Sequence, residues 1–388
     1  MSEREEAIEQ LVETVRRFAR EVLIPAEPEV EETDDIPAPI IQQLKNLGLF
    51  GMTISEQYDG LGLSLYEEVR VVAALTYASP VYRSYFGTSN GVGTLGLTVD
   101  GTEEQRQRYL PRIAKGEMLA SFCLTEPDAG SDAAALTTQA ARQTDREGES
   151  YIINGTKRFT TNSPHAGLFT VFARTAPKEA GVAGISAFLV EAGTPGLTVA
   201  KPYKKMGFRG AHTADVIFEN CRVPASALLG GREGIGFASA MKSLDHARVH
   251  MAAVAVGMCE RLLDEGTSYA LDRRQFNRPI AQFQLVQGML ADCAAEALAA
   301  RAMVEAVARD YVDGRRITKQ SACCKYFATE ALGRIADRVL QIHGGYGYIK
   351  EFPVERLYRD ARLLRIFEGT SQIQQLIIAR EMIRERTA

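Results

Sequence analysis

The character of the sequence changes twice along the chain, and this limits the folds available to it. Up to about residue 118, hydrophobic residues recur at the three- and four-residue spacing of amphipathic helices. Residues 119–225 instead contain short runs of β-branched and aromatic residues, separated by glycine, proline and asparagine, as strands usually are. After Gly230-Gly231, long alanine-rich runs typical of a helical bundle continue to the end. We therefore predict a mainly α protein with an N-terminal helical domain (1–118), a middle β domain (119–230) and a C-terminal helical bundle (231–388).

Some element boundaries are also predicted. Pro25 should end the first helix, and Ser64 to Glu67 has the pattern of a capping box that opens another. The middle domain should be a small antiparallel barrel or sandwich, with Asn154-Gly155 as a tight hairpin turn. Its expected strands are Tyr151–Phe159, Leu168–Ala173, Ile185–Val190 and Asp215–Phe218.

Composition excludes several classes of function. The net charge of −4 argues against a nucleic-acid or anionic-membrane surface, and no apolar run approaches the length of a membrane span. The six cysteines form no CxxC pair, which favours buried thiols in a reducing compartment. His246 and His250 are four residues apart but lack the glutamate of a zinc motif. We expect a cytoplasmic enzyme with no metal, no membrane insertion and no nucleic-acid partner.

Glu368 is the strongest candidate for a chemical role. It lies between Ile366-Phe367 and Gly369, and a carboxylate in apolar surroundings has a raised pKa that suits a general base. Thr370 is a plausible N-cap for a helix from Ser371 to about Arg384. The segment taken alone favours an ordinary helix-capping loop.

Two glycine-containing segments are candidate ligand loops. Leu124–Asp132 offers hydroxyls and a proline-fixed turn that could meet a polar ring edge or a phosphate, although a capped surface turn is as good an interpretation. Gly91–Gly96 matches GxGxxG by letters, but no strand precedes it. We interpret it as close helix packing or the floor of a pocket.

Together these stretches resemble the acyl-CoA dehydrogenase family over nearly the whole chain. The matching stretches occur in the family's order and spacing and are Leu124–Asp132, Asn154–Asn162, Arg273–Phe276, Gln341–Gly345 and Glu368–Gln372. The resemblance implies the family fold, with a β-barrel-like middle domain and a C-terminal four-helix bundle. It also implies oxidation of an acyl-CoA thioester to the trans-2-enoyl-CoA with FAD. Glu368 would remove the α-proton while the β-hydride passes to flavin N5.

The resemblance also assigns binding residues. The cofactor contacts it implies are Phe122, Leu124, Thr125, Ser131, Phe159, Thr161, Arg273, Phe276, Gln284, Gln341, Gly344, Gly345, Thr370 and Gln372. Arg273 and the turn at 341–345 would reach the FAD pyrophosphate of a neighbouring subunit, although Arg273 also fits a solvated helix end. Most relatives have tryptophan where this chain has Phe159, and the chain contains no tryptophan.

The implied substrate contacts are Arg83, Ser84, Ser131, Asp245, Arg248 and Gly369. Asp245 and Arg248 equally fit a surface ion pair three residues apart. A few family members carry the base just before the arginine that corresponds to Arg248, but that position here is Ala247, which cannot serve.

Arg83 carries the main indication of the acyl group. It lies in an uncharged stretch, so it needs an anionic partner or access to water. Tyr82-Arg83-Ser84 resembles the motif with which glutaryl-CoA dehydrogenases hold the distal carboxylate of their substrate. Those enzymes have a glutamate seven residues earlier, where this chain has Thr76. Arg83 therefore binds a dicarboxylic acyl chain or anchors a helix end, with equal weight.

We expect an FAD-dependent acyl-CoA dehydrogenase on a dicarboxylic (glutaryl-type) chain or, alternatively, a short-, medium- or branched-chain monocarboxylic acyl group. An acyl-CoA oxidase and a non-catalytic flavoprotein are the rival functions. The family further implies a homotetramer, built as a dimer of dimers, and an electron-transfer flavoprotein as electron acceptor.

Overall fold

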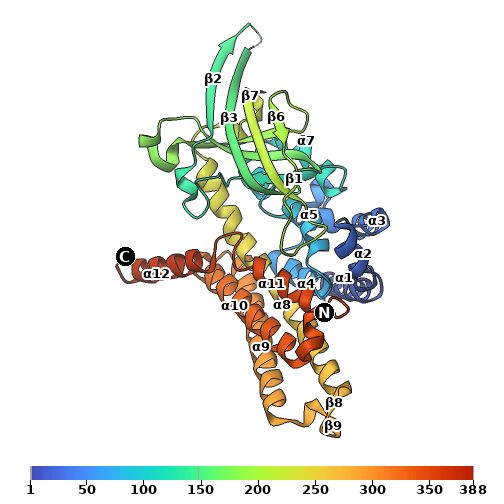
Figure 1. Cartoon of the computed structure of the whole chain (residues 1–388). Helices are drawn as coiled ribbons and strands as arrows, with labels where there is room; N and C mark the ends of the chain where they lie inside the picture. Colours follow the sequence, from blue (N-terminus) through green and yellow to red (C-terminus); the bar gives the residue numbers. More distant parts are fainter. Residues whose placement is uncertain (1, 147, 388) are drawn as a thin grey trace.

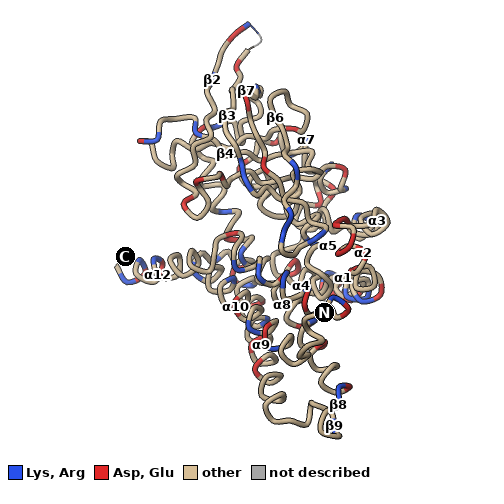
Figure 2. The backbone as a smooth tube through the Cα atoms, viewed as in Figure 1, with Lys and Arg blue, Asp and Glu red and all other residues tan. Residues whose placement is uncertain are grey.

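The computed structural model describes residues 2–146 and 148–387 and has a large sheet at one end of the molecule and long helices at the other (Figure 1). The order of helices, strands and helices is as predicted. Basic and acidic residues are both scattered over the helices and the sheet (Figure 2). No helix in the described part of the chain is long and apolar enough to cross a membrane.

The N-terminal helices are α1 (Glu3–Phe18), α2 (Ile24–Thr33), α3 (Ala38–Asn46), α4 (Leu65–Leu75), α5 (Val81–Asn90), α6 (Leu95–Asp100) and α7 (Glu103–Ala114). The capping box predicted at Ser64 is present at the start of α4. The predicted helix end at Pro25 is wrong, because the chain continues through a π-helical turn, Ala19–Leu23, directly into α2. The wider turn and a place in the first turn of α2 accommodate the proline, which has no N–H to donate.

The middle strands are β1 (Leu119–Cys123), β2 (Gln139–Asp145), β3 (Gly148–Thr161), β4 (Ala166–Arg174), β5 (Ile185–Glu191), β6 (Leu197–Val199) and β7 (Thr213–Pro224). They form one sheet in the order β1-β4-β2-β3-β7-β6, with β5 paired to β4. The sheet is mixed rather than purely antiparallel, because β1 runs parallel to β4. The long excursion through β2 and β3 allows this pairing, which a tight turn does not.

The predicted hairpin turn at Asn154-Gly155 is also wrong. Both residues lie inside β3, where the pairing with β7 shifts register. Asn154 Oδ1 accepts the backbone N–H of Asn220 at 2.7 Å, and a Cβ on Gly155 would lie 2.4 Å from the Thr138 hydroxyl. The pair is therefore a β-bulge that brings the backbone close to its neighbour.

The C-terminal helices are α8 (Gly236–Asp272), α9 (Gln284–Val312), α10 (Thr318–His343), α11 (Pro353–Leu363) and α12 (Ser371–Thr387), and the short hairpin β8 (Arg274–Gln275) and β9 (Arg278–Pro279) joins α8 to α9. Helix α8 packs against α4, α9 and α10. One continuous core, with members such as Val72, Met251 and Leu332, therefore joins the N-terminal helices to the bundle.

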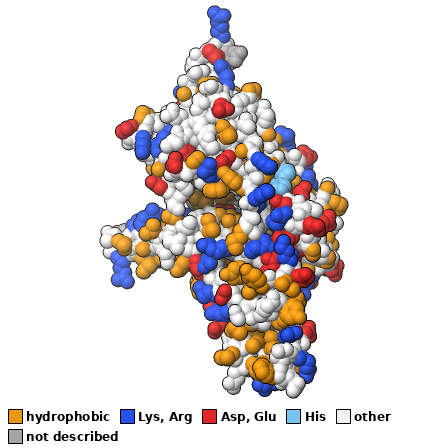
Figure 3. All heavy atoms as spheres, viewed as in Figure 1, with side chains coloured by type: hydrophobic (Ala, Val, Ile, Leu, Met, Phe, Trp, Pro, Cys, Tyr) orange, Lys and Arg blue, Asp and Glu red, His pale blue; other side chains and the backbone are white. Residues whose placement is uncertain are grey.

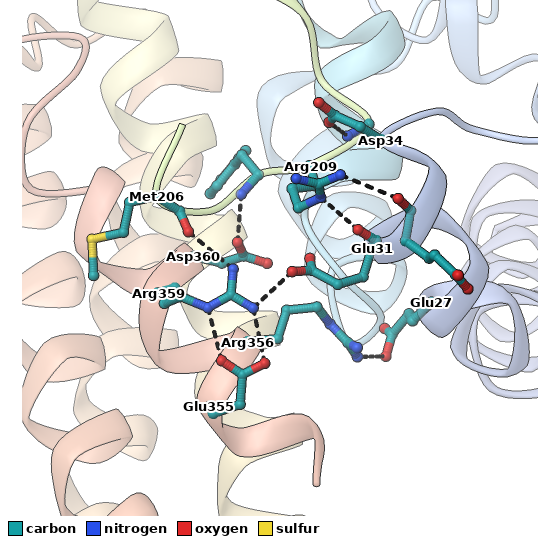
Figure 4. Close-up of polar contacts among 12 residues, drawn as sticks. Glu27, Glu31, Asp34, Met206, Arg209, Glu355, Arg356, Arg359 and Asp360 are labelled. Atoms are coloured by element: carbon teal, nitrogen blue, oxygen red, sulfur yellow. Dashed lines mark hydrogen bonds and ion pairs between the residues drawn. The ribbon is translucent and has the colours of Figure 1, made fainter. Parts of the chain in front are cut away.

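Buried charges fasten α2, the loop before β7 and α11 together (Figure 4). Arg356 on α11 pairs with Glu27 on α2 at 2.5 Å, and Asp360 Oδ1 accepts the backbone N–H of Phe208 at 2.6 Å. The Phe208 ring in turn meets Phe367 edge-on, with ring centroids 6.2 Å apart. This three-part junction thus ends one residue from Glu368.

Candidate active site

Glu368 lies in the loop between α11 and α12 with an unusual backbone conformation. Its φ is 52°, a left-handed value that is uncommon outside glycine, and Gly369 follows with φ 88°. Thr370 caps α12 as predicted, since its hydroxyl accepts the Ile373 N–H at 3.2 Å. The Glu368 carboxylate atom Oε2 is shielded from solvent and has no hydrogen-bond partner among the described residues.

Opposing electrostatic effects act on the Glu368 carboxylate. Burial raises its pKa, and the positive charges of Arg83, Lys325, Arg248 and His246, in decreasing order of effect, lower it again. Burial remains dominant, so the pKa lies above the ordinary value for glutamate, as the sequence predicted. The four cations meanwhile favour the ionised form that a base must have.

Arg83 is buried on α5 and held by a histidine. Its Nε donates to His250 Nε2 at 2.5 Å, so that ring nitrogen must be unprotonated. His250 Nδ1 therefore carries the proton and donates it to the buried carboxylate of Glu68. Burial lowers the pKa of His250 to about 4, which keeps the ring neutral at physiological pH. The second Glu68 oxygen meets His246 Nε2 at 2.8 Å.

No acid pairs directly with Arg83 anywhere in residues 2–146 or 148–387. Thr76, which stands where the glutaryl enzymes have glutamate, uses its hydroxyl to cap α4 by donating to Val72 O at 2.8 Å. Glu68, two helical turns before Thr76, reaches Arg83 only through His250. The guanidinium also lies against Gly87, where a Cβ would come within 2.6 Å of the arginine.

The other predicted substrate contacts are partly engaged already. The Ser84 hydroxyl donates to Pro80 O at 3.2 Å, and Ser84 O accepts from Asn162 Nδ2 at 2.8 Å. Asp245 and Arg248 form the expected ion pair at 2.5 Å, but Arg248 is buried rather than on the surface. That arginine thus lies close enough to Glu368 to affect its charge.

The predicted cofactor loop is fixed by a buried ion pair. Glu126 accepts from Lys157 Nζ at 2.7 Å and from the backbone N–H groups of Thr137 and Thr138 at 2.6 and 2.9 Å. Burial would raise the pKa of Glu126, but these donors outweigh it and lower the pKa to about 2. Lys157 also donates to Leu124 O at 3.3 Å. The start of the loop is therefore anchored to β3 by Lys157 and, through Glu126, to the segment before β2.

The donors near this loop fit a flavin. The hydroxyls of Thr125, Ser131 and Thr161 make no hydrogen bond to any other described residue. The Phe159 side chain is 61% exposed beside Tyr203, with ring centroids 5.4 Å apart, so it presents an uncovered aromatic surface. Phe122 and Leu124 line the same strand end. Free hydroxyls next to an uncovered ring suit a planar heterocycle with polar edges.

The second group of predicted cofactor residues lies elsewhere. An open cavity of about 480 Å³ at the end of the bundle near β8 and β9 is lined by Arg273, Gly344 and Gly345, among others. A Cβ on either glycine would meet nothing within 4 Å, and Arg273 makes no ion pair with the described residues. Open backbone beside an unpaired arginine fits a pyrophosphate.

The structure does not bring this second group together with the loop at 122–131. Phe276, Gln284 and Gln341 are all exposed around the cavity end, whereas Thr370 and Gln372 start α12 beside Glu368. Figure 1 shows β8 and β9 at the opposite end of the molecule from the sheet. One cofactor could contact both groups only across two chains, as the sequence resemblance implied.

The sequence reasoning missed four residues of the site. His250 and Glu68 hold Arg83, Lys157 holds the cofactor loop, and Lys325 donates to the backbone on both sides of Glu368. For Glu68, His250 and Lys325 the available signal was a polar residue inside an apolar helical pattern, and for Lys157 it was a lysine inside a predicted strand. It is a weak signal, because a lone lysine on a helix usually lies at its solvated face.

Comparison with known proteins agrees with this geometry. Family models for the N-terminal, middle and C-terminal domains of acyl-CoA dehydrogenases match residues 5–117, 121–221 and 234–383. The chain is 42% identical to acryloyl-CoA reductase (NADH) of Anaerotignum propionicum, over 97% of this chain and 94% of the relative.

Two solved structures are similar over nearly their whole length. Butyryl-CoA dehydrogenase from Megasphaera elsdenii has a TM-score of 0.92 at 32% identity, covering 97% of this chain and 98% of that one. Glutaryl-CoA dehydrogenase from Mycobacterium smegmatis has a TM-score of 0.90 at 29% identity, covering 98% and 95%. With three matched domains and a fitting cofactor site, the chain belongs to the acyl-CoA dehydrogenase family and is an FAD-dependent oxidoreductase that acts on the CH–CH bond of acyl-CoA thioesters.

Proposed function

We propose that Glu368 is the base that removes the α-proton of the acyl-CoA substrate in an α,β-dehydrogenation. The observation that carries this proposal is the shielded Oε2 atom, which has no protein partner among the described residues although four cationic groups surround the carboxylate. A carboxylate that only supported the fold would use its oxygens in hydrogen bonds. In Glu368 the four cations favour the ionised form, and the free Oε2 atom is open to a proton.

The loop around Glu368 also offers donors for the thioester carbonyl. The backbone N–H groups of Glu368, Gly369 and Thr370 make no hydrogen bond to any described residue. They lie at the N-terminus of α12, where the helix dipole favours developing negative charge. Such donors acidify the α-proton by stabilising the enolate-like charge on the carbonyl oxygen.

FAD, when bound, accepts the hydride from the β-carbon. Thr125, Ser131, Thr161 and Phe159 would hold its ring system, and Arg273 with Gly344-Gly345 of a second chain would hold its pyrophosphate. Support comes from the unused hydroxyls, the exposed ring and the unpaired arginine described above.

Glu368→Gln tests the base directly. The amide keeps the shape of the side chain but is not basic, so we expect normal FAD content. The rate of anaerobic flavin bleaching by acyl-CoA should fall by several orders of magnitude, because general-base catalysis alone supplies about 10²–10⁴-fold. Glu381→Gln is the matched control, because Glu381 is a buried acid on α12 that pairs with Arg316 instead. Bleaching of the Glu368→Gln variant at the wild-type rate would place the base elsewhere.

For the acyl group we propose a dicarboxylic, glutaryl-type chain whose distal carboxylate meets Arg83. The support is a buried guanidinium that has a histidine but no acid as its hydrogen-bond partner in the described chain. A buried cation without an anion is costly, and a substrate carboxylate would compensate it. A short-, medium- or branched-chain monocarboxylic acyl group remains the alternative.

A second candidate is the same chemistry in the direction of reduction. The 42% identical relative is named as an acryloyl-CoA reductase that uses NADH. The residues proposed here would serve either direction, because the base returns the α-proton in reverse. Bleaching of oxidised flavin by acyl-CoA, compared with reoxidation of reduced flavin by enoyl-CoA, distinguishes the two.

For the assembly we propose a homotetramer, a dimer of dimers, with an electron-transfer flavoprotein as electron acceptor. Hydrophobic side chains gather at the bundle end near β8 and β9 (Figure 3), where Phe276 and Leu285 are each 86% exposed. A monomer rarely exposes such patches, and one FAD could meet both groups of proposed cofactor residues only across two chains. A cytoplasmic location is supported by six cysteines that are all unpaired.

A further inference from the structure

The catalytic loop contains two consecutive left-handed residues that need external support. Glu368 has φ 52° and Gly369 has φ 88°. Glycine adopts such values freely, but a glutamate does so against steric repulsion and persists there only where its surroundings hold it. Residues 364–370 belong to neither α11 nor α12, so helical hydrogen bonds do not supply this support.

Side chains from two helices donate hydrogen bonds to three successive backbone carbonyls of this loop. Lys325 Nζ donates to Phe367 O at 3.1 Å and to Gly369 O at 2.7 Å. Gln374 Nε2 donates to Gly369 O at 3.0 Å and to Glu368 O at 3.4 Å. Gln374 belongs to the helix that follows the loop, but Lys325 comes from α10, more than 40 residues earlier.

Lys325 is placed unlike an ordinary structural lysine. Its side chain is fully buried, yet among the described residues it forms no ion pair, whereas the other fully buried lysine, Lys157, pairs with Glu126. Burial lowers the pKa of Lys325 to about 8, and the charge of Glu368 is the largest effect in the opposite direction. The ammonium is therefore mostly retained at neutral pH, and the acid that compensates its charge most is the candidate base.

We propose that Lys325 is a positioning residue for Glu368, whose backbone it fixes in the left-handed conformation through the carbonyls on either side. The ammonium donates hydrogen bonds to the carbonyl cluster, which consists of Phe367 O, Glu368 O and Gly369 O, and it places a positive charge near the carboxylate. This inference rests on the proposed function, in which Glu368 is the base. Lys325 touches no reacting atom and acts only through Glu368.

Three variants separate hydrogen bonding from charge. Lys325→Met removes both, Lys325→Gln keeps an N–H donor without charge, and Lys325→Arg keeps both. Lys319→Met is the matched control, because Lys319 lies on the same helix but pairs with Glu385 at the surface. We expect Lys325→Met to slow anaerobic flavin reduction about 10- to 100-fold, as release of a strained residue would. Lys325→Arg should recover most of that loss, and Lys319→Met should have the wild-type rate.

The pH dependence of the flavin reduction rate reports the effect of the Lys325 charge on Glu368. Glu368 is faced by Arg83 from α5, Arg248 and His246 from α8, and Lys325 from α10. Removal of one cation raises the pKa of the base, so the acid limb of the reduction rate should move to higher pH in Lys325→Met and Lys325→Gln. It should stay in place in Lys325→Arg.

Hydrogen–deuterium exchange of residues 366–372, in which the N–H groups of Ile366, Phe367 and Ser371 are hydrogen-bonded to backbone carbonyls, reports the loop conformation without any turnover. We expect faster exchange there in Lys325→Met than in the wild type or Lys319→Met. Wild-type exchange together with an unmoved acid limb would overturn the proposal even if activity fell. If the methionine variant fails to fold, the same two measurements on Lys325→Gln and Lys325→Arg decide. Failure of the proposed function gives a different result from failure of the Lys325 proposal. If Glu368 were not the base, the flavin of Glu368→Gln would still be bleached by acyl-CoA, although substitution of Lys325 would still change hydrogen–deuterium exchange in the loop.

Discussion

Replacement of Arg83 by methionine separates the two interpretations of this arginine. The guanidinium is buried, donates through Nε to His250, and presses against Gly87. Methionine keeps the length of the stem and its apolar contacts but has no charge and no donor. A loss of packing should therefore affect all acyl-CoA substrates alike, whereas the loss of a carboxylate contact should affect only dicarboxylic ones.

The magnitude follows from the surroundings of Arg83. A hydrogen bond between charged groups contributes about 1.5–3 kcal/mol, and each 1.36 kcal/mol is roughly tenfold in rate. Because His250 and Glu68 hold the guanidinium in place, little is lost to its reorientation when the substrate binds. We expect the ratio of kcat/KM for glutaryl-CoA over butyryl-CoA to fall by about 10- to 150-fold in Arg83→Met.

The assay is steady-state turnover with both esters, with Arg261→Met as control. Arg261 is another buried arginine, on α8, that pairs with Glu265. His250→Leu removes the acceptor of the Arg83 Nε–H and should lose part of the discrimination, which His250→Gln should restore through its amide oxygen. Equal losses for the two esters in Arg83→Met would refute the carboxylate contact and leave Arg83 as an anchor of α5.

Two further predictions concern assembly and stability. Arg273→Ala should release FAD and weaken the oligomer together, as measured by absorbance and light scattering; a stable tetramer with full FAD would make Arg273 a solvated helix end. Burial raises the pKa of Asp360 to about 6, so the folded state binds its proton more tightly than the unfolded chain, and this penalty on stability appears as pH rises from about 4 to 6. The control is Asp360→Asn, whose amide oxygen can still accept the Phe208 N–H. Relative to this variant, the free energy of unfolding of the wild type should increase by up to about 3 kcal/mol as pH falls from 7 to 4, and its melting temperature should rise accordingly. A melting temperature difference between the two proteins that does not change with pH would contradict the buried, ionisable state.

Local patterns in the sequence predicted the features that depend on local chemistry. Apolar neighbours around Glu368 were enough to indicate burial and a raised pKa, and Thr370 and Ser64 were recognisable caps because capping involves residues three positions apart. Close packing at the GxGxxG letters was also predictable. A Cβ on Gly93 would lie 2.7 Å from Thr88 O and 3.0 Å from Ala120 O, so the backbone is closely packed there.

Features that depend on residues distant in the sequence could not be predicted this way. The parallel pairing of β1 with β4 and the bulge at Asn154-Gly155 depend on what lies across the sheet. Lys325 and Glu368 are similarly separated, and neither the carbonyl cluster nor the charge balance leaves a local pattern. The division into domains at 118 and 230 stays a prediction, as do the binding roles assigned residue by residue.

The charge balance at Glu368 leads to one more consequence for the substrate. Arg83 lowers the pKa of Glu368 more than any other charge does, so a distal carboxylate that neutralises Arg83 should raise the pKa of this proposed base in the complex. The pH dependence of kcat reports groups in the enzyme–substrate complex. The acid limb of kcat should therefore lie at higher pH with glutaryl-CoA than with butyryl-CoA in the wild type, and the two limbs should coincide in Arg83→Met. Coincident limbs in the wild type would mean that no substrate carboxylate compensates this arginine.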